Sequence, residues 1–340
     1  MTAAILPRAV YRARQRIRPW IRSTPLVASP ALSAGSGGEV HLKLEHLQAT
    51  GSFKLRGAAN AILALSEDQR RKGVVGVSTG NHGRGLAHAA AQAGVGCTIY
   101  MSALVPANKV EAIRALGAEV RIVGRSQDDA QVEVDRLVAE EGKVMLPPFD
   151  HPDIIAGQGT LGLEILEALP AVETVLVPLS GGGLIAGIAL VLKAADPAIR
   201  VIGVSMERGA AMIACQRAGR PVSVEELPTL ADALGGGIGM DNRYTFRMVR
   251  DLVDDFVTVT EAEIAAAVRH AYWSEHQVVE GSGSVGIAAL LAGKVRDAGV
   301  TLALVSGGNI DTKLHKRIID GEDVDVLAER EGEAPIRAAD

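Results

Sequence analysis

The sequence predicts an α/β protein with two open, mostly parallel, twisted sheets flanked by helices. Short β-branched runs alternate with apolar-periodic stretches of helix length, as parallel βαβ units require. Aromatic residues make up only 3% of the 340 residues, so the core must be built from Ala, Val, Leu and Ile, which suits parallel strands covered by helices. A chain of this length exceeds the usual size of one hydrophobic core, which favours two domains.

The N-terminal segment is strongly basic. Its first 38 residues contain no acid, and six arginines lie between Arg8 and Arg22. These arginines interrupt every apolar stretch that could serve as a secretory signal, although composition alone does not exclude an organelle presequence. We expect an N-terminal helix with an exposed basic face, because "RSTPLVASPALS" leads directly into sequence with regular patterning.

The first series of strand and helix patterns begins at residue 74. "VVGVST" precedes "NHGRGLAHAAAQAG", "GCTIYM" precedes "NKVEAIRALG", and "AEVRIVG" precedes "SQDDAQVEVDRLVAEEG". The pattern breaks at "VMLPPFDHPD", residues 144–153, where two prolines indicate a crossing between domains. We therefore predict a small domain over residues 46–143.

The second series follows this loop and belongs to a large domain formed by residues 1–45 and 144–320. Strands are predicted at "TVLVP", "RVIGVSM", "DFVTVT" and "TLALV", with helices at "LIAGIALVLKAA", from Ala210, at "EAEIAAAVRHAYWSEH", after the next glycine turn, and from Asp311. The stretch 220–250 is less regular and is predicted to form loops. Residues 321–340 are charged and lack periodicity, which predicts a flexible tail.

Charge, hydropathy and cysteine content exclude several classes of protein. A net charge of −5 leaves no electrostatic footprint for nucleic acid, and no apolar run is long enough to span a membrane. The two cysteines, Cys97 and Cys215, form neither a disulfide framework nor a metal-binding spacing. We expect a cytoplasmic protein that acts on a small molecule.

Glycine-rich turns mark the expected ligand site, because ligands of open α/β sheets collect at the carboxyl ends of strands. Three such turns follow predicted strands: "STGNHG" (78–83), "LSGGGL" (179–184) and "VSGGN" (305–309). In the second, consecutive glycines let backbone N–H groups converge on one anion at a helix N-terminus. This turn therefore predicts a phosphate site.

A dinucleotide is one phosphate compound that the second turn could hold. Gly181, Gly183 and Ala186 match the looser GxGxxA pattern, and Glu207 ends the next predicted strand, where a ribose-binding acid belongs. The literal GxGxxG at residues 281–286 lies behind a helix, which is the wrong context. A nicotinamide-dependent dehydrogenase using residues 181–186 thus stays open as an alternative.

Lys54 favours a different cofactor. It stands between Phe53 and Leu55 in "TGSFKLRGAAN", and an ammonium group in an apolar setting has a lowered pKa that makes it a usable amine. A lysine amine combined with a phosphate cradle is the binding apparatus of pyridoxal phosphate. Arg56, two residues further on, is expected to pair with an acid such as Glu45.

In these motifs the chain resembles the fold-type II pyridoxal-phosphate enzymes, with the tryptophan-synthase-β-like architecture, and within them the branch of serine/threonine dehydratases and serine racemases. The resemblance extends from about residue 5 to residue 320. It is carried, in order, by "TPL" (24–26), "KLEHLQATGSFKLRGAAN" (43–60), "STGNHGRGLAHAA" (78–90), "VPANKVEAIRALGAEV" (105–120), "IIAGQGTLGLEIL" (154–166), "VPLSGGGLIAGIA" (177–189) and "LVSGGNID" (304–311).

The resemblance implies specific roles around the cofactor. Lys54 would hold pyridoxal phosphate as a Schiff base and act as the catalytic base, with Phe53 against one face of the ring. Asn81 would hydrogen-bond the ring hydroxyl, and Ser306 would face the ring nitrogen. The phosphate would be bound by Gly181, Gly182, Gly183 and Leu184, and the substrate carboxylate by Ser78, Thr79, Gly80, Asn81 and His82.

The implied reaction is β-elimination from a β-hydroxy amino acid such as threonine or serine, giving a 2-oxo acid and ammonia. Racemisation is the alternative within the family, but Thr79, the second catalytic candidate, stands where a racemase would place a serine, and its methyl group and stiffer rotamer disfavour that role. Ser205 occupies a position where relatives often carry a cation-binding acid. We therefore assign no metal.

Two segments refine the expected substrate. "RPWIRSTPLVASPALS" (18–33) and "ADALGGGIG" (231–239) resemble dehydratases assigned to hydroxyectoine utilisation, which implies a hydroxyectoine-derived β-hydroxy compound. Relatives in the branch are commonly dimers or tetramers. The resemblance thus implies a homodimer.

Overall fold

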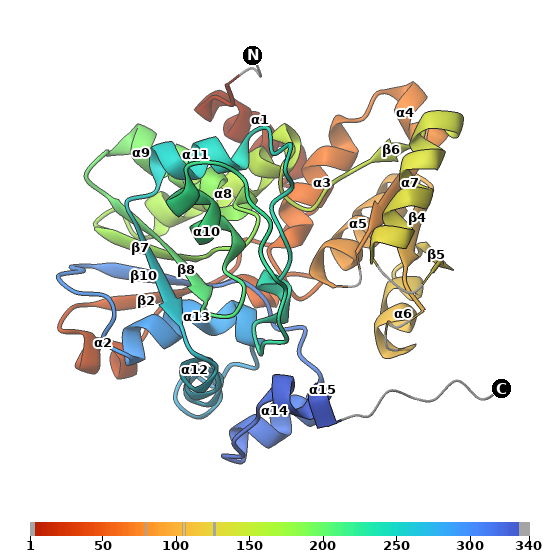
Figure 1. The fold of residues 1–340 in the computed structure, drawn as a ribbon. Helices are drawn as coiled ribbons and strands as arrows, with labels where there is room; N and C mark the ends of the chain where they lie inside the picture. Colours follow the sequence, from red (N-terminus) through yellow and green to blue (C-terminus); the bar gives the residue numbers. More distant parts are fainter. Residues whose placement is uncertain (1–3, 79, 104, 106, 125–126, 333–340) are drawn as a thin grey trace.

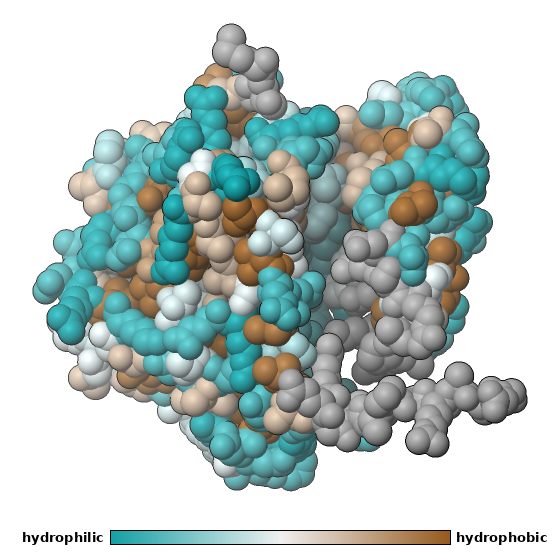
Figure 2. All heavy atoms as spheres, viewed as in Figure 1, coloured by the Kyte–Doolittle hydropathy of each residue, from teal (hydrophilic) through white to brown (hydrophobic). Residues whose placement is uncertain are grey.

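The computed structural model describes residues 4–78, 80–103, 105, 107–124 and 127–332. These residues form two α/β lobes, each organised around its own sheet (Figure 1). Hydrophilic side chains dominate the outer surfaces that Figure 2 shows, and a hollow separates the lobes. Each helix in this part of the chain is too short or too polar to traverse a lipid bilayer.

The larger sheet has six strands in the order β1-β2-β10-β7-β8-β9. All neighbours are parallel except β1 and β2, which are antiparallel. The parallel register places Val305 opposite Leu44, so the segments that follow these two residues leave the sheet side by side. The strands are β1 (Leu26–Ala28), β2 (Val40–Leu44), β7 (Thr174–Pro178), β8 (Arg200–Met206), β9 (Asp255–Val259) and β10 (Thr301–Val305).

Both faces of this sheet are covered by helices, which is why its central strands read as continuous apolar runs. Along β7, Leu176 packs into one core cluster, whereas Val175 and Val177 pack into the other. The helices of this lobe are α1 (Pro7–Ile17), α2 (Pro30–Ser36), α8 (Pro152–Ala168), α9 (Gly183–Ala195), α10 (Ala211–Ala218), α11 (Thr245–Leu252), α12 (Glu261–Trp273), α13 (Gly281–Leu291), α14 (Thr312–Ile319) and α15 (Val326–Gly332), with short 3-10 turns η1 (Glu45–Leu47) and η2 (Asp232–Leu234).

The smaller sheet has four parallel strands in the order β5-β4-β3-β6. Leu86 and Ile99 lie in a core cluster on one face, and Tyr100 packs with Val134 and Leu137 on the other. The strands are β3 (Val74–Val77), β4 (Cys97–Met101), β5 (Glu119–Ile122) and β6 (Val144–Met145), and the helices are α3 (Lys54–Ala64), α4 (Glu67–Lys72), α5 (Asn81–Ala93), α6 (Ala107–Arg114) and α7 (Gln127–Glu141).

The helices begin where side-chain capping groups allow. Thr260 and Glu263 form a reciprocal capping box at the start of α12, and Asp311 accepts from the N–H groups of Lys313 and Leu314 at the start of α14. By contrast, the N-cap residues of α5 and α9, Gly80 and Gly182, have no side chain that could cap these helices. The N-termini of α5 and α9 therefore keep backbone donors for a ligand.

The predicted boundary between the domains needs a correction. The sequence pattern predicts residues 144 and 145 as part of the crossing loop, but they form β6 and pair with Val74 and Val75 of the small sheet. The crossing therefore begins after Met145. A two-residue strand next to two prolines leaves too little pattern to be recognised in the sequence.

Two predicted loop regions contain helices. The stretch 220–250 includes η2 and the start of α11, whose first residues are held by Asp150, since its carboxylate accepts from the N–H groups of Tyr244 and Thr245. The predicted tail includes α15, which Asp325 joins to Arg208. Val326 packs against the large-lobe core. Long-range contacts stabilise both helices, so local periodicity did not reveal them.

Candidate active site

Lys54 begins helix α3 at the junction of the two lobes. The residue before it, Phe53, is tied to the large sheet because its N–H donates to the carbonyl of Ser306 at 3.0 Å. Lys54 Nζ donates to the carbonyl of Pro148 at 2.9 Å, in the loop that crosses between the lobes. Hydrogen bonds thus join the start of α3 to two segments that are distant from it in sequence.

Two cavities meet at Lys54. One, of about 50 Å³, is lined by Phe53, Ser306 and the glycine run before α9. The other, of about 290 Å³, is lined by Ser78, Gly80, Asn81 and His82 and opens between the lobes. Lys54, Asn81, Pro148, Ala233 and Glu280 line both cavities. A group attached to the amine could therefore extend towards the glycine run, while a second molecule approaches from the other side.

The glycine run has the geometry of an anion cradle. Gly182 adopts φ +85°, and a Cβ added at Gly181 would lie 2.3 Å from Cδ1 of Phe149, so neither position accepts a side chain without displacement. The buried residues Gly183 and Leu184 begin α9, where first-turn N–H groups have no intrahelical acceptor. A phosphate on these donors would be stabilised by the helix dipole.

Burial sets the protonation states in the site. Desolvation lowers the pKa of Lys54 to about 8, so a useful fraction of its amine is neutral near pH 7. Burial, reinforced by the nearby Lys54 charge, also lowers the pKa of His82 to about 3. His82 Nε2 lies 2.9 Å from the carbonyl of Leu146, which can only accept, so Nε2 carries the proton of a neutral ring.

The pKa of Lys54 predicts how the protein takes up a carbonyl cofactor. The reactive neutral amine makes up about a tenth of the total at pH 7, against less than about a thousandth for an ordinary lysine. We expect the rate at which the cofactor-free protein gains visible absorption with pyridoxal phosphate to rise with pH and level off above about 8. Nα-acetyl-lysine, measured alongside, reports the ordinary amine. A rate of cofactor uptake that still rises tenfold per pH unit above pH 9 would contradict the lowered pKa of Lys54.

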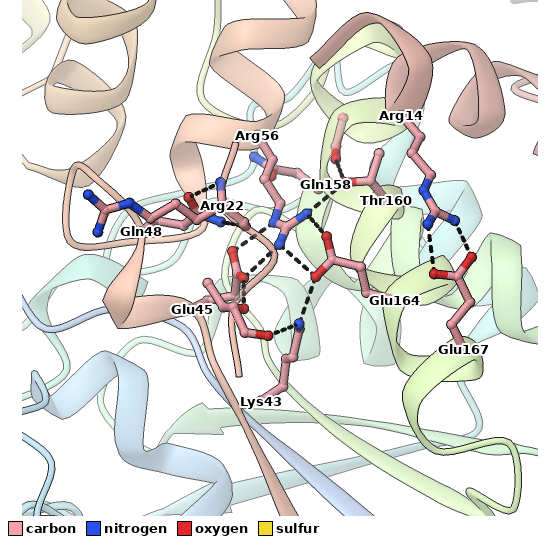
Figure 3. A network of polar contacts seen from close by, with 12 residues as sticks. Arg14, Arg22, Lys43, Glu45, Gln48, Arg56, Gln158, Thr160, Glu164 and Glu167 are labelled. Atoms are coloured by element: carbon pink, nitrogen blue, oxygen red, sulfur yellow. Dashed lines mark hydrogen bonds and ion pairs between the residues drawn. The ribbon is translucent and has the colours of Figure 1, made fainter. Parts of the chain in front are cut away.

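A buried ion cluster surrounds Arg56, which follows Lys54 by two residues on α3 (Figure 3). The guanidinium of Arg56, which is 1% exposed, donates to both carboxylate oxygens of Glu45, both of Glu164 and the hydroxyl of Thr160. Lys43 Nζ donates to Glu164 at 2.6 Å. The expected pairing of Arg56 with Glu45 is confirmed. The cluster ties α3 to β2, η1 and α8, and so fixes the helix that carries Lys54.

The structure brings together most of the residues that the sequence singled out. Phe53, Lys54, Asn81, Leu184 and Ser306 line the smaller cavity, with the glycines of the run, and Ser78, Gly80 and His82 line the larger one. Thr79 lies outside the described residues. The Ser78 hydroxyl accepts from Gly83 N–H at 3.0 Å, so it also shapes the turn into α5. Within the described ranges, no group of three or more His, Cys, Asp or Glu side chains is arranged to hold a metal ion.

Sequence reasoning missed Glu280. This residue is 5% exposed, lines both cavities and accepts a hydrogen bond from Asn81. The available signal was the same as for Lys54, because Glu280 is a single charge in the otherwise uncharged run "QVVEGSGSVGIAALL".

Fold and site together have the donor set for a phosphorylated carbonyl compound: a lysine amine of lowered pKa in one cavity with an uncapped, glycine-rich helix N-terminus. The chain belongs to the pyridoxal-phosphate dependent enzymes, whose family model matches residues 17–307. The predicted cofactor, pyridoxal phosphate, is thereby confirmed, and the dinucleotide alternative loses its support.

Individual relatives agree with this assignment. A provisionally named threonine dehydratase of Sinorhizobium fredii is 61% identical over 92% of this chain and 95% of its own length. An L-threonine ammonia-lyase of Thermotoga maritima is 44% identical over 92% of this chain and 77% of its own. The solved structure of maize serine racemase is 34% identical, with a TM-score of 0.88 over 93% of this chain and 97% of its own. The predicted fold class and family branch are confirmed.

Proposed function

We propose that the protein eliminates water from a β-hydroxy amino acid and releases a 2-oxo acid and ammonia. The observation that carries the proposal is the amine of Lys54, with its lowered pKa, where two cavities meet. The names of the Sinorhizobium and Thermotoga relatives support this reaction. The identity of 61% over nearly the full length of both chains makes a shared reaction class the simplest assignment.

The smaller cavity would hold the cofactor. Gly181, Gly182, Gly183 and Leu184 would bind the phosphate through backbone N–H groups. The ring would lie against Phe53, with the Asn81 amide at its hydroxyl and the Ser306 hydroxyl, which is 3% exposed, at its nitrogen. A neutral hydroxyl does not stabilise a protonated ring nitrogen as a carboxylate would. This residue set fits elimination, in which negative charge leaves with the β-substituent.

The larger cavity would hold the substrate. The N-terminus of α5 presents the N–H groups of Asn81 and His82 to a carboxylate, and the helix dipole adds to this attraction. Neutral His82 adds no charge, and its donation to Leu146 fixes its ring. Thr79 would complete this loop.

The proton chemistry would rest on Lys54. When bound, pyridoxal phosphate supplies an electron sink conjugated to the substrate α-carbon. Lys54 Nζ would take the α-proton, since a pKa of about 8 lets it both accept and return a proton near neutral pH. The carbonyl of Pro148 would hold the ammonium afterwards, as it accepts from Nζ in this structure.

The charges around the larger cavity bear on the choice of substrate. Glu226, Asp232 and Asp311 line it, and the cationic side chains in its lining are Arg84 and Lys54. An adjoining cavity of about 620 Å³ shares these three carboxylates and extends to Glu329 of α15. We propose that an ammonium-bearing side chain is accepted better than an acidic one, which fits a hydroxylated diamino acid of the kind derived from hydroxyectoine.

The decisive test is ammonia release from a panel of amino acids. Purified holoenzyme should be yellow and release ammonia and a 2-oxo acid from threonine, serine or 3-hydroxy-2,4-diaminobutyrate. Its kcat/KM for 3-hydroxyaspartate should be at least about tenfold lower than for the diamino acid, because the carboxylates that line the cavity repel an acidic side chain. Alanine, which lacks a β-leaving group, is the control. A yellow protein that releases ammonia from none of these compounds would refute elimination.

Racemisation is the second candidate, favoured by the similarity to maize serine racemase. Chiral chromatography of serine and threonine recovered from the same reactions distinguishes it, because a racemase accumulates the opposite enantiomer without loss of total amino acid. The expected homodimer and the cytoplasmic location stay predictions.

A further inference from the structure

Glu280 is a buried carboxylate without a role in the reaction proposed above. It precedes α13 as its N-cap residue, yet its side chain caps no N–H group of that helix. Instead, its carboxylate reaches Asn81, on the opposite lobe, with Nδ2 of Asn81 donating to Oε1 at 2.7 Å. Its position between the two cavities places it beside both proposed ligands.

The hydrogen bonds around Glu280 fix which end of each amide donates. Asn309 Nδ2 donates to the carbonyl of Thr50 at 2.9 Å, and a carbonyl can only accept. The same Nδ2 donates to Oδ1 of Asn81 at 2.6 Å, so Asn81 must turn its Nδ2 towards Glu280. Oε2 of Glu280 accepts from the Asn309 backbone N–H at 3.1 Å. A backbone carbonyl at one end and a carboxylate at the other therefore determine the orientation of the Asn81 amide.

This orientation has a consequence for the cofactor. Asn81 Nδ2 has two hydrogens, and one of them goes to Glu280. Among the contacts of the described residues none takes the other hydrogen, which can reach an acceptor in the cavities that Asn81 lines. If the amide were reversed, Oδ1 would face that acceptor and repel it. We propose that Glu280 is a positioning residue that keeps Asn81 as a donor to the cofactor, an inference that rests on the proposed function.

Glu280 also joins the two lobes. Asn81 begins α5 of the small lobe, whereas Glu280 and Asn309 belong to the large one. The close approach depends on Gly307, since a Cβ there would lie 2.1 Å from Oε1 of Glu280. An alanine at this position would displace the carboxylate without removing it.

The Glu280→Gln substitution tests the proposal, because it preserves shape but brings an amide N–H against groups that already donate. We expect pyridoxal phosphate to bind the variant about 10- to 100-fold more weakly, the range for loss of a hydrogen bond to a charged group. The visible absorption band of the holoenzyme should shift or weaken, and Gly307→Ala should have the same effects. Glu226→Gln, which removes a carboxylate that lines the larger cavity but not the smaller one, is the matched control and should bind the cofactor as the wild type does.

The readouts separate positioning from stability. Cofactor affinity and spectrum within twofold of the wild type in both variants would overturn the proposal, even if the cofactor-free protein unfolds at a lower temperature. A similar loss of cofactor affinity in Glu226→Gln would also overturn the proposal, because the loss of any negative charge from the cavity would then explain the effect. Wild-type protein that binds no pyridoxal phosphate would instead refute the assigned cofactor site, and wild-type holoenzyme that releases no ammonia would refute only the proposed reaction.

Discussion

Lys54→Ala is expected to yield a folded, colourless protein whose ammonia release falls by roughly 10³-fold or more. The substitution removes both the covalent attachment point and the base at the α-carbon. Folding should survive, because the lysine amine makes a single described hydrogen bond, to the carbonyl of Pro148, and loses solvation to make it. Visible spectra and coupled ammonia assays measure the two effects.

The attachment point can be mapped directly. Borohydride reduction of the wild-type holoenzyme should fix the cofactor to the peptide that contains Lys54, which mass spectrometry identifies. Lys313→Ala, at an exposed position in α14, is the matched control and should keep both colour and activity. A reduced adduct on any other lysine, or a yellow and active Lys54→Ala protein, would contradict the assignment of the site.

Arg56→Met is expected to lower the free energy of unfolding by about 3–5 kcal/mol, the usual cost of removing one partner from a buried ion cluster. Glu45, which is fully buried, would lose its only cationic partner among the contacts described, and Glu164 would keep Lys43 alone. Denaturant titration of the cofactor-free protein measures the change. Arg14→Met breaks the exposed ion pair with Glu167 further along α8 and should cost less than about 1 kcal/mol.

The free energy of unfolding that Arg56→Met loses should depend on pH with a defined sign. Burial alone would raise the pKa of Glu164, but Arg56 and Lys43 outweigh it and hold the pKa below its ordinary value. A carboxylate whose pKa is lower in the folded state than in the unfolded state stabilises the fold. This stabilisation is fully present above the pKa of the unfolded state and is lost as the pH falls through the pKa of the folded state. The difference in free energy of unfolding between the wild type and Arg56→Met should therefore become smaller below about pH 4.5. A gap that widens on acidification, or a cost equal to that of Arg14→Met, would contradict this account.

Local patterns revealed the strands and helices whose stabilising groups lie close together in sequence. β7 and β10 are apolar runs followed by glycine turns, and α12 carries its own capping box. The short strand β6 and the helices α11 and α15 were missed because they depend on partners far away, such as Val74 for β6 and Asp150 for α11. Those partners cannot be read from a local window.

The sequence by itself determined the chemical groups of the site: an amine in an apolar setting at Lys54, a glycine run before a helix, and a hydroxyl at Ser306 after a strand. The glycine run by itself also fitted a dinucleotide, and its combination with the lysine amine favoured pyridoxal phosphate. Only the tertiary structure decided how the groups are held. Glu280 orients the amide of Asn81, and Glu45 and Glu164 hold the guanidinium of Arg56. Glu280 and Glu164 come from parts of the chain that are distant in sequence from the residues they contact. Hydrogen bonds and ion pairs act over a few ångströms, and folding alone establishes those distances.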